Sequence, residues 1–369
     1  MTILARMPRL HRLALLLALV AFGLPATASA RVPQGFVGVD AGGPLFNSDV
    51  SLSRQMDTMV ASGVQSVRVV FNWSAAQPSP GGPIDFAATD AIVAAAAAHG
   101  MTVLPTVLYA PGWDATGAQQ IPARTGPYAA YLTALIGRYG PRGSFWANHP
   151  RHPIRMWQIW NEENLPVYWP QPFARSYAKL LAASHAAIKR ADPGAKVVSG
   201  ALTNVAWRYL GQLNHVRGAL HSYDMIAING FTSTPARVIE FLQLMRRGAD
   251  RTGARSKPIL ATELSWPSSR GHDTDQFDWD TTERGQARNV GALLPLLAAH
   301  RSSLRLAGFY YYTWVTQPAP HDNFNYAGLL SYDPGGRIVA KPALRAFRAA
   351  ALRIEGCKRK GRTATACVR

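Results

Sequence analysis

Residues 65–109 contain one complete strand–helix–strand unit. It reads QSVRVVFNW at 65–73, FAATDAIVAAAAAH at 86–99 and MTVLPTVLY at 101–109. The two outer runs are nearly continuous in apolar, often β-branched residues, which is typical of strands covered on both faces. The central run is rich in alanine, the residue with the highest helix propensity. The unit therefore predicts two parallel strands joined by a helix that packs on the sheet.

The same alternation continues along the chain in both directions. It predicts eight strands, over residues 35–40, 65–73, 101–109, 155–160, 196–202, 225–231, 258–263 and 306–314. It predicts helices over residues 51–62, 86–99, 128–139, 173–190, 207–216, 235–251, 282–300 and 342–352. Eight such units match a closed (β/α)8 TIM barrel, here a single domain over residues 31–350. The competing architecture is an open doubly wound sheet, which would usually carry a G-x-G-x-x-G turn that this sequence lacks.

The composition fits a large folded domain. Hydrophobic residues make up 48% of the 369 residues, which rules out wholesale disorder, and charged residues make up only 16%, which argues against a coiled coil. The formal net charge is +18. A basic surface can favour acidic glycans, cell-wall polymers or nucleic acid. A general bias toward arginine and alanine is the simpler explanation, and we expect no nucleic-acid partner.

Residues 1–30 resemble an export signal. Arg6, Arg9 and Arg12 precede an apolar stretch over residues 13–24, which is too short to span a bilayer, and Ala28-Ser29-Ala30 fits a cleavage site. These features predict a secreted protein that begins near Arg31 and has no membrane span after cleavage. An uncleaved anchor is the alternative.

Residues 351–369 form a basic C-terminal tail. It carries six lysine and arginine residues against one glutamate, a net charge of +5. Cys357 and Cys367 are the only two cysteines of the chain. In an exported protein they predict a disulfide that closes a small loop. The charge suggests a contact between this tail and a cell-wall polyanion.

Two carboxylates stand at the ends of otherwise apolar strands. The active sites of (β/α)8 barrels lie at the C-terminal ends of the strands. Glu162 directly follows MWQIWN at 156–161, and Glu263 directly follows PILAT at 258–262. Neighbouring aromatic residues would partly desolvate such carboxyl groups and raise their pKa values. Cleavage of a glycosidic bond needs this pair, one group as acid and the other as base or nucleophile.

The pattern resembles the retaining (β/α)8 glycoside hydrolases, the clan that includes cellulases, mannanases and β-xylosidases. The resemblance covers roughly residues 35–350. It implies that Glu162 is the acid/base, that Glu263 is the nucleophile and that Asn161 bonds the sugar 2-hydroxyl. It also implies that Arg68 supports the nucleophile and that Trp314 is the aromatic platform under the sugar. No cofactor is expected.

One run departs from this clan. Many relatives carry His-x-Tyr at the end of strand six, with the tyrosine hydroxyl touching the nucleophile, but here the run is Ile-Asn-Gly-Phe at 228–231. Phe231 has no hydroxyl. Tyr109 or Tyr312 could replace it, or Glu263 could be held less well. The second possibility leaves open a barrel that binds carbohydrate without hydrolysing it.

Further residues after the strand ends are candidates for substrate binding. Asn229 and Tyr109 are polar candidates, and four tryptophans are expected to stack on sugar faces, namely Trp73, Trp113, Trp169 and Trp266. The ten histidines show no H-E-x-x-H spacing, so no metal is expected. The acidic run at 273–280 is expected to be a solvated loop, with a calcium site as the alternative.

Together these observations predict a secreted enzyme that cleaves a poly- or oligosaccharide by double displacement. Retention of configuration requires the two carboxyl groups to lie about 5–5.5 Å apart. Two other hypotheses stay open: a carbohydrate-binding barrel without activity, and a surface protein that binds polyanions through its basic tail.

Overall fold

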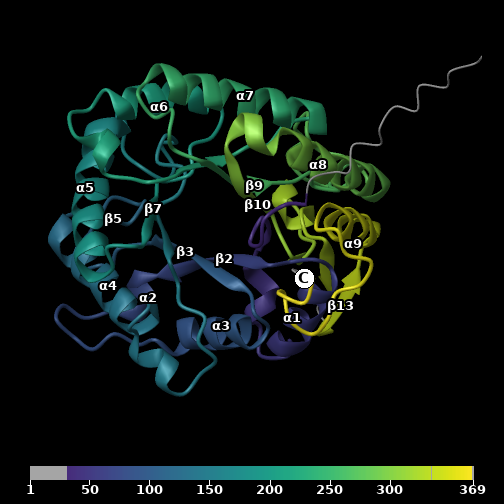
Figure 1. Ribbon diagram of the computed structural model, residues 1–369, viewed down its shortest axis with the longest axis horizontal. Helices are drawn as coiled ribbons and strands as arrows, with labels where there is room; N and C mark the ends of the chain where they lie inside the picture. The colour runs from purple at the N-terminus through teal and green to yellow at the C-terminus, as the bar shows by residue number, and fades with distance from the viewer. Residues whose placement is uncertain (1–30, 334, 368–369) are drawn as a thin grey trace, which may run out of the picture.

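The computed structural model describes residues 31–333 and 335–367. The predicted export signal at 1–30 lies outside these residues. Eight parallel strands form the central sheet (Figure 1): β1 Val37–Asp40, β2 Ser66–Asn72, β3 Thr102–Leu108, β6 Met156–Ile159, β7 Lys196–Val198, β8 Ile226–Asn229, β9 Ile259–Leu264 and β10 Leu306–Tyr311. Each strand lies within one of the predicted runs or extends it by a single residue.

The sheet closes on itself. Its order is β7-β6-β3-β2-β1-β10-β9-β8, and β1 pairs with both β2 and β10. The two outer strands of this order meet through parallel bridges between Val198 and Met225 and between Leu202 and Ile228. The structure is therefore a (β/α)8 barrel, as predicted, and not an open doubly wound sheet.

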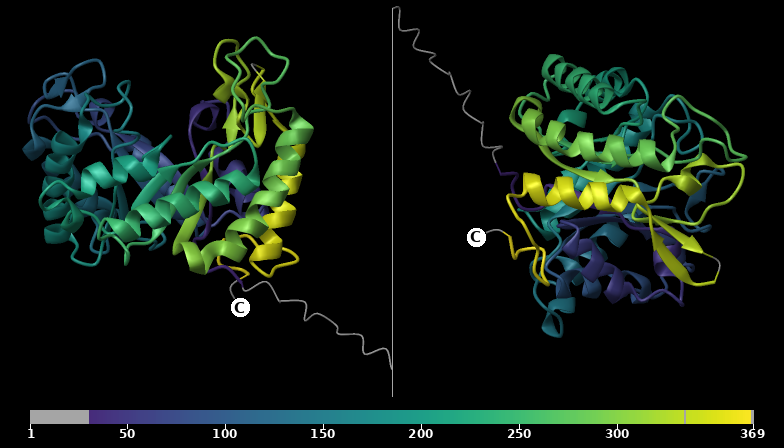
Figure 2. Two further views of the ribbon diagram at one scale, coloured as in Figure 1. Left: turned by 90° about the horizontal axis from the view of Figure 1, so that it is seen from above. Right: turned by 90° about the vertical axis from the view of Figure 1, so that its right-hand side faces the viewer.

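Helices surround the barrel (Figures 1 and 2). They are α1 Leu52–Ala61, α2 Trp73–Ala76, α3 Ala87–Ala98, α4 Thr125–Tyr139, α5 Phe173–Ala191, α6 Ala206–Asn214, α7 Pro235–Arg251, α8 Glu283–Leu304 and α9 Pro342–Ile354. Local sequence sets several of their starts. Ser51, Thr234 and Thr282 each accept a hydrogen bond from a first-turn amide, and Pro235 stands at the first position of α7.

Short elements between the barrel strands and helices were not predicted. A hairpin of β4 Ala115–Thr116 and β5 Ile121–Pro122 follows β3. A three-stranded sheet of β11 Val315–Thr316, β12 Leu330–Asp333 and β13 Arg337–Ala340 follows β10. Single-turn 3₁₀ helices are η1 Gly43–Phe46, η2 Ser144–Ala147, η3 Ala219–His221 and η4 Asn323–Tyr326.

Side chains fill the interior of the barrel. Tyr310 on β10 is 1% exposed, and its hydroxyl lies 2.8 Å from the Ser66 hydroxyl. Gly38 on β1 leaves room for this ring, because a Cβ atom there would lie 2.5 Å from the Tyr310 ring. Tyr310 is thus a core residue, as expected, and it closes the barrel beneath the polar groups of the mouth.

The C-terminal tail packs at the opposite end of the barrel from the mouth (Figure 2). Residues 351–354 still belong to α9. Beyond them the Ala364 amide donates to the His99 carbonyl at 2.8 Å, in the turn that precedes β3. A disulfide joins Cys357 and Cys367, whose Cα atoms are 5.7 Å apart. Among the described residues, no helix combines the length and the apolar character that a membrane crossing requires.

Candidate active site

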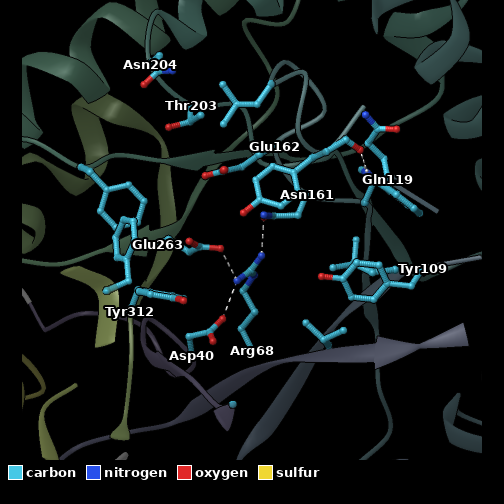
Figure 3. Close-up of a pocket in the computed structure, with 18 of the residues that line it drawn as sticks. Asp40, Arg68, Tyr109, Gln119, Asn161, Glu162, Thr203, Asn204, Glu263 and Tyr312 are labelled. Carbon is cyan, nitrogen blue, oxygen red and sulfur yellow. Dashed lines mark hydrogen bonds and ion pairs between the residues drawn. The ribbon is translucent and has the colours of Figure 1, made fainter. Parts of the chain in front are cut away.

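A cavity of about 470 Å³ opens at the C-terminal ends of the strands, and both predicted carboxylates line it (Figure 3). Glu162 and Glu263 are each 8% exposed. They are therefore largely desolvated but still reachable from the cavity. The fold brings together two residues that are 101 positions apart in the sequence, one just after β6 and the other on β9 of the same barrel.

Arg68 on β2 organises the floor of this cavity. Its Nη1 donates to Asp40 Oδ2 at 2.6 Å and to Glu263 Oε1 at 2.8 Å. Its Nη2 donates to Asn161 Oδ1 at 2.8 Å, and its Nε donates to Gln158 Oε1 at 2.9 Å. The guanidinium group is 4% exposed and uses its planar fork to fix four partners. Its predicted place beside Glu263 agrees with these contacts.

Strand register explains why these groups meet. Asp40 on β1 is paired with Arg68 on β2, so their side chains are neighbours on the barrel interior. Gln158 on β6 is fully buried, and its Oε1 also accepts from the Thr106 hydroxyl at 3.3 Å. Sequence reasoning missed Gln158, and it placed Asp40 at a strand end without giving it a role. The available signal was a polar residue at an inward position of an otherwise apolar strand.

Glu162 is positioned by an amide rather than by a cation. Asn229 Nδ2 donates to Glu162 Oε1 at 2.8 Å, and the Thr262 hydroxyl donates to Asn229 Oδ1 at 2.9 Å. Thr262 therefore turns the NH₂ group of Asn229 toward Glu162. Burial raises the pKa of Glu162, which the Asn229 bond and the charge of Arg68 oppose. Asn229 was predicted to contact substrate; in the structure it is fully buried and its amide positions Glu162.

Three carboxyl groups surround the one guanidinium. Burial raises the pKa of Glu263, Arg68 lowers it, and the negative charges of Glu162 and Asp40 raise it further. Burial likewise raises the pKa of Asp40. All three groups cannot ionise together in a desolvated pocket beside one cation. Because Arg68 bonds Asp40 and Glu263 directly, Glu162 is the group best placed to keep a proton near neutral pH.

The structure corrects the predicted tryptophan contacts. Trp314 is completely buried and its indole N–H donates to Gln55 Oε1 at 3.0 Å. Trp266 is 1% exposed and its N–H donates to the Thr232 carbonyl at 2.7 Å. Neither residue lines the cavity, and the chain beyond each strand directs both indoles into the protein interior. Trp73 and Trp169 are also buried, and Trp113 is partly buried with its N–H on the Gln77 carbonyl.

Other aromatic residues line the cavity instead. Tyr109 faces it as predicted, and the full set is Tyr109, Trp160, Tyr168, Phe231, Phe277, Trp279, Tyr312 and Phe324. The hydroxyl groups of Tyr109 and Tyr312 make no hydrogen bond to Glu263 within the part of the chain that the structure describes. Burial and the nearby Glu263 charge raise the pKa of Tyr312. Nothing in the described residues thus replaces the tyrosine hydroxyl that Phe231 lacks.

Several solved structures that are similar to this chain are glycoside hydrolases. A family 39 glycoside hydrolase from Bacteroides cellulosilyticus WH2 has a TM-score of 0.67 and 18% identity, over 88% of this chain and 64% of its own. A monomeric β-xylosidase from Caulobacter crescentus CB15 has a TM-score of 0.65 and 20% identity, over 87% of this chain and 69% of its own. The GH53 catalytic domain from Ignisphaera aggregans has a TM-score of 0.60 and 21% identity, over 86% of this chain and 97% of its own.

These similarities establish the barrel fold. No protein-family model matches the sequence, and no curated protein matches it either. The fold and the site together define a (β/α)8 barrel with a buried pair of glutamates at its mouth.

Proposed function

We propose that this protein is a retaining glycoside hydrolase that cleaves O-glycosidic bonds of a poly- or oligosaccharide or a smaller glycoside. The observation that carries the proposal is the shared cavity of Glu162 and Glu263, in which Arg68 bonds one glutamate and the Asn229 amide bonds the other. The two carboxyl groups therefore differ in environment, and this difference separates a nucleophile from an acid.

The first step forms a glycosyl–enzyme bond. A carboxylate oxygen of Glu263 attacks the anomeric carbon while the bond from that carbon to the leaving oxygen breaks. The proton of Glu162 passes to the leaving oxygen. Arg68 holds Glu263 by its Oε1 atom at 2.8 Å, which restricts the rotation of the attacking group.

The second step releases the sugar. Glu162, now ionised, takes a proton from water, the water oxygen bonds to the anomeric carbon, and the ester bond to Glu263 breaks. Two displacements at one carbon restore its original configuration. Asn161 has its Oδ1 atom occupied by Arg68, so its NH₂ group is the one left to donate to a sugar hydroxyl.

A panel of aryl glycosides and natural glycans, with product analysis, tests the proposal. We expect turnover of at least one substrate with retained anomeric configuration, and loss of turnover in Glu263→Gln. Asp333→Asn is the control, because Asp333 lies far from the cavity on β12. Binding without turnover would favour the carbohydrate-binding barrel, and near-normal turnover in Glu263→Gln would overturn the assignment.

We also propose that the protein is exported and that its tail contacts an anionic cell-wall polymer. Arg353, Lys358, Arg359 and Arg362 are exposed on the tail, which supports the second point. Replacing Lys358, Arg359 and Arg362 by glutamine should abolish a salt-dependent association with such a polymer. An association that ignores both salt and these substitutions would contradict it.

A further inference from the structure

One side of the active-site cavity is almost entirely aromatic. We call Phe231, Phe277, Trp279 and Phe324 the aromatic wall; all four line the cavity. Phe277 and Trp279 stack with ring centroids 4.6 Å apart and an interplanar angle of 3°. Phe231 packs edge-on against Phe324 at 4.9 Å and lies 6.4 Å from Trp279. Phe231, which has no hydroxyl to bond the nucleophile, is thus part of an aromatic surface in the cavity.

The wall is held in place rather than loosely exposed. Asp280 is 2% exposed; one of its carboxylate oxygens accepts from the Phe277 amide at 2.6 Å and the other accepts from Asn323 Nδ2 at 2.7 Å. Asp280 therefore ties the loop after β9 to the 3₁₀ helix that carries Phe324. Phe277 nevertheless remains 45% exposed at the rim of the cavity.

The four residues of the wall offer almost nothing to a sugar hydroxyl, and the nearest hydroxyl is that of Tyr312, whose ring packs against Phe231 and Phe324 at the edge of the wall. Three of its members are phenylalanines, and the Nε1 atom of Trp279 is buried without a hydrogen-bond partner among the described residues. A sugar ring placed there would lose water from its hydroxyl groups without replacement, which is costly. A flat apolar group has no hydrogen bonds to water that it would lose there, and it would gain contact with the stacked rings.

Polar groups gather on the other side of the cavity. Asp40, Arg68, Tyr109, Gln119 and Asn161, from β1 to β6, are the groups there that can bind sugar hydroxyls. The glycone belongs on that side. The wall borders both glutamates. Phe231 follows Asn229, the partner of Glu162, by two residues, and Phe277 and Trp279 stand in the loop after β9, the strand that carries Glu263.

We infer that the aromatic wall binds a flat apolar leaving group, such as an aromatic aglycone, rather than a second sugar. The inference rests on the proposed function and narrows its substrate class. Phe277 and Trp279 are then specificity-determining residues, and Asp280 is a positioning residue for them. The bond that breaks and the proton that moves are those of the first step described above.

Binding of thioglycosides, which resist hydrolysis, tests the inference separately from turnover. The probes are phenyl and methyl 1-thio-β-D-glycosides of xylose and glucose, and the corresponding thio-linked disaccharides. Phe277→Ala and Trp279→Ala should each raise the Kd of the phenyl compound that binds best by about tenfold and leave that of its methyl counterpart within about twofold. Phe46→Ala is the control, because Phe46 is 48% exposed but lies outside this cavity.

Each outcome bears on one claim. Equal losses for phenyl and methyl compounds would mean that the wall supports the glycone, and a loss confined to the disaccharides would mean that it binds a second sugar; either overturns the inference. No binding of any phenyl compound by the intact protein also overturns it. The expected binding pattern with no turnover of the matching aryl O-glycosides would instead overturn the proposed function.

Discussion

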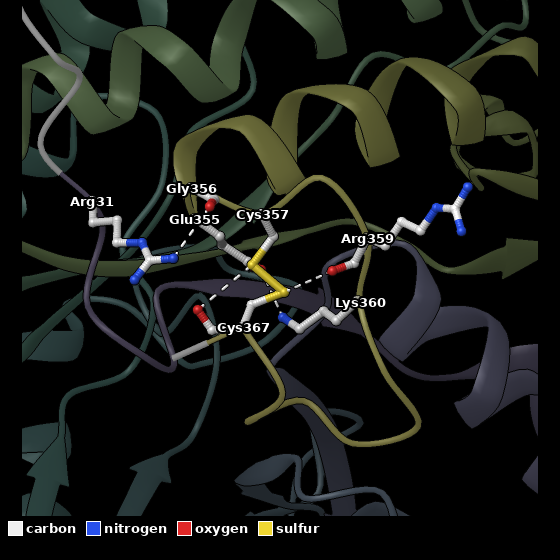
Figure 4. The surroundings of a disulfide bond; sticks show 7 residues. All are labelled: Arg31, Glu355, Gly356, Cys357, Arg359, Lys360 and Cys367. Carbon is white, nitrogen blue, oxygen red and sulfur yellow. Dashed lines mark hydrogen bonds and ion pairs between the residues drawn. A yellow bond between two sulfur atoms is a disulfide. The ribbon is translucent and has the colours of Figure 1, made fainter. Parts of the chain in front are cut away.

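Both ends of the barrel bury a cation among carboxyl groups, but they balance its charge differently. At the end opposite the mouth, where the tail packs and which we call the closed end, Lys360 Nζ lies 2.7 Å from Glu355 Oε2. These two side chains are 0% and 2% exposed. The pair sits beside the disulfide of the tail (Figure 4). At the mouth, Arg68 bonds two carboxylates, Asp40 and Glu263, beside an accessible cavity.

The comparison separates two uses of buried charge. One cation for one carboxylate, without an opening, fixes the position of a chain segment. An excess of carboxyl groups in a cavity cannot ionise fully, so protons remain there to be moved. Both ends contain a buried ion pair, so the pair alone does not distinguish them. They differ in the number of carboxyl groups per cation and in access to solvent.

The largest expected contrast comes from the same substitution at the two ends. Glu263→Gln should lower kcat/KM at least about a thousandfold, because it removes the nucleophile, while leaving the unfolding midpoint close to that of the wild type. Glu355→Gln should leave activity intact and lower the unfolding free energy by about 3 kcal/mol, because Lys360 loses its buried partner. Kinetics and urea unfolding on both variants measure the contrast, and similar activity losses in both would erase it.

The disulfide provides the next test of the closed end. Cys357 and Cys367 are separated by 10 residues, and closing a loop of this size restricts the unfolded chain by about 2–3 kcal/mol. The double substitution to serine should therefore lower the unfolding free energy by that amount. The activity of the folded fraction should not change, since the disulfide lies at the far end of the barrel. A loss of kcat in fully folded protein would contradict this separation.

Glu163 tests the cost of a buried carboxyl group near the mouth but outside the cavity. It is completely buried, its oxygens have no hydrogen-bond partner among the described residues, and burial raises its pKa to about 8. The folded protein therefore binds a proton that the unfolded chain releases above about pH 4.5. Its contribution to stability is complete below that pH and is lost as the pH rises toward 8.

Glu163→Gln should flatten this part of the pH dependence of unfolding. We expect the fall in stability between pH 5 and pH 8 to shrink by about 1 kcal/mol or more. Glu240→Gln, at an exposed position of α7, is the matched control and should leave the slope unchanged. The slope of unfolding free energy against pH is the quantity to compare. The new amide also lacks hydrogen-bond partners, but this lowers stability equally at every pH and does not change the slope. An unchanged slope in Glu163→Gln would show that this carboxyl group does not titrate as described.

The smallest expected effect concerns the charge balance of the mouth. Asp40 raises the pKa of Glu263 through its negative charge. Asp40→Asn keeps an oxygen acceptor for Arg68 but removes that charge. The acidic limb of the pH profile of kcat/KM should move to lower pH by up to about one unit. Asp275→Asn, on the exposed loop after β9, should not move it. A shift to higher pH would reverse the charge argument.

The strands and the two glutamates were predictable because each depends on local pattern. Runs such as 101–109 are long and apolar. Glu162 and Glu263 stand out because each is a charged residue at the end of another such run. Arg68 was predictable from the resemblance. That Arg68 would bond Asp40 and Gln158 was not predictable, because strand register decides which inward residues become neighbours.

Tryptophans were the weakest part of the sequence prediction. Trp266 and Trp314 follow strand ends, but one residue more or less in a turn decides whether a ring faces the cavity or the core. Trp279 and Phe277 stand in an irregular loop, and only the contacts of Asp280 place them at the cavity. Loops without periodicity carry no signal for such placement.

The central claim is that Glu263 and Glu162 act on the same anomeric carbon. A 2-deoxy-2-fluoro glycoside with a good leaving group should accumulate as a covalent adduct, and peptide mass spectrometry should place the sugar on Glu263. The adduct should fail to form in Glu263→Gln. A substrate that is hydrolysed with inversion and leaves no adduct, or a sugar attached to a residue other than Glu263, would contradict the account.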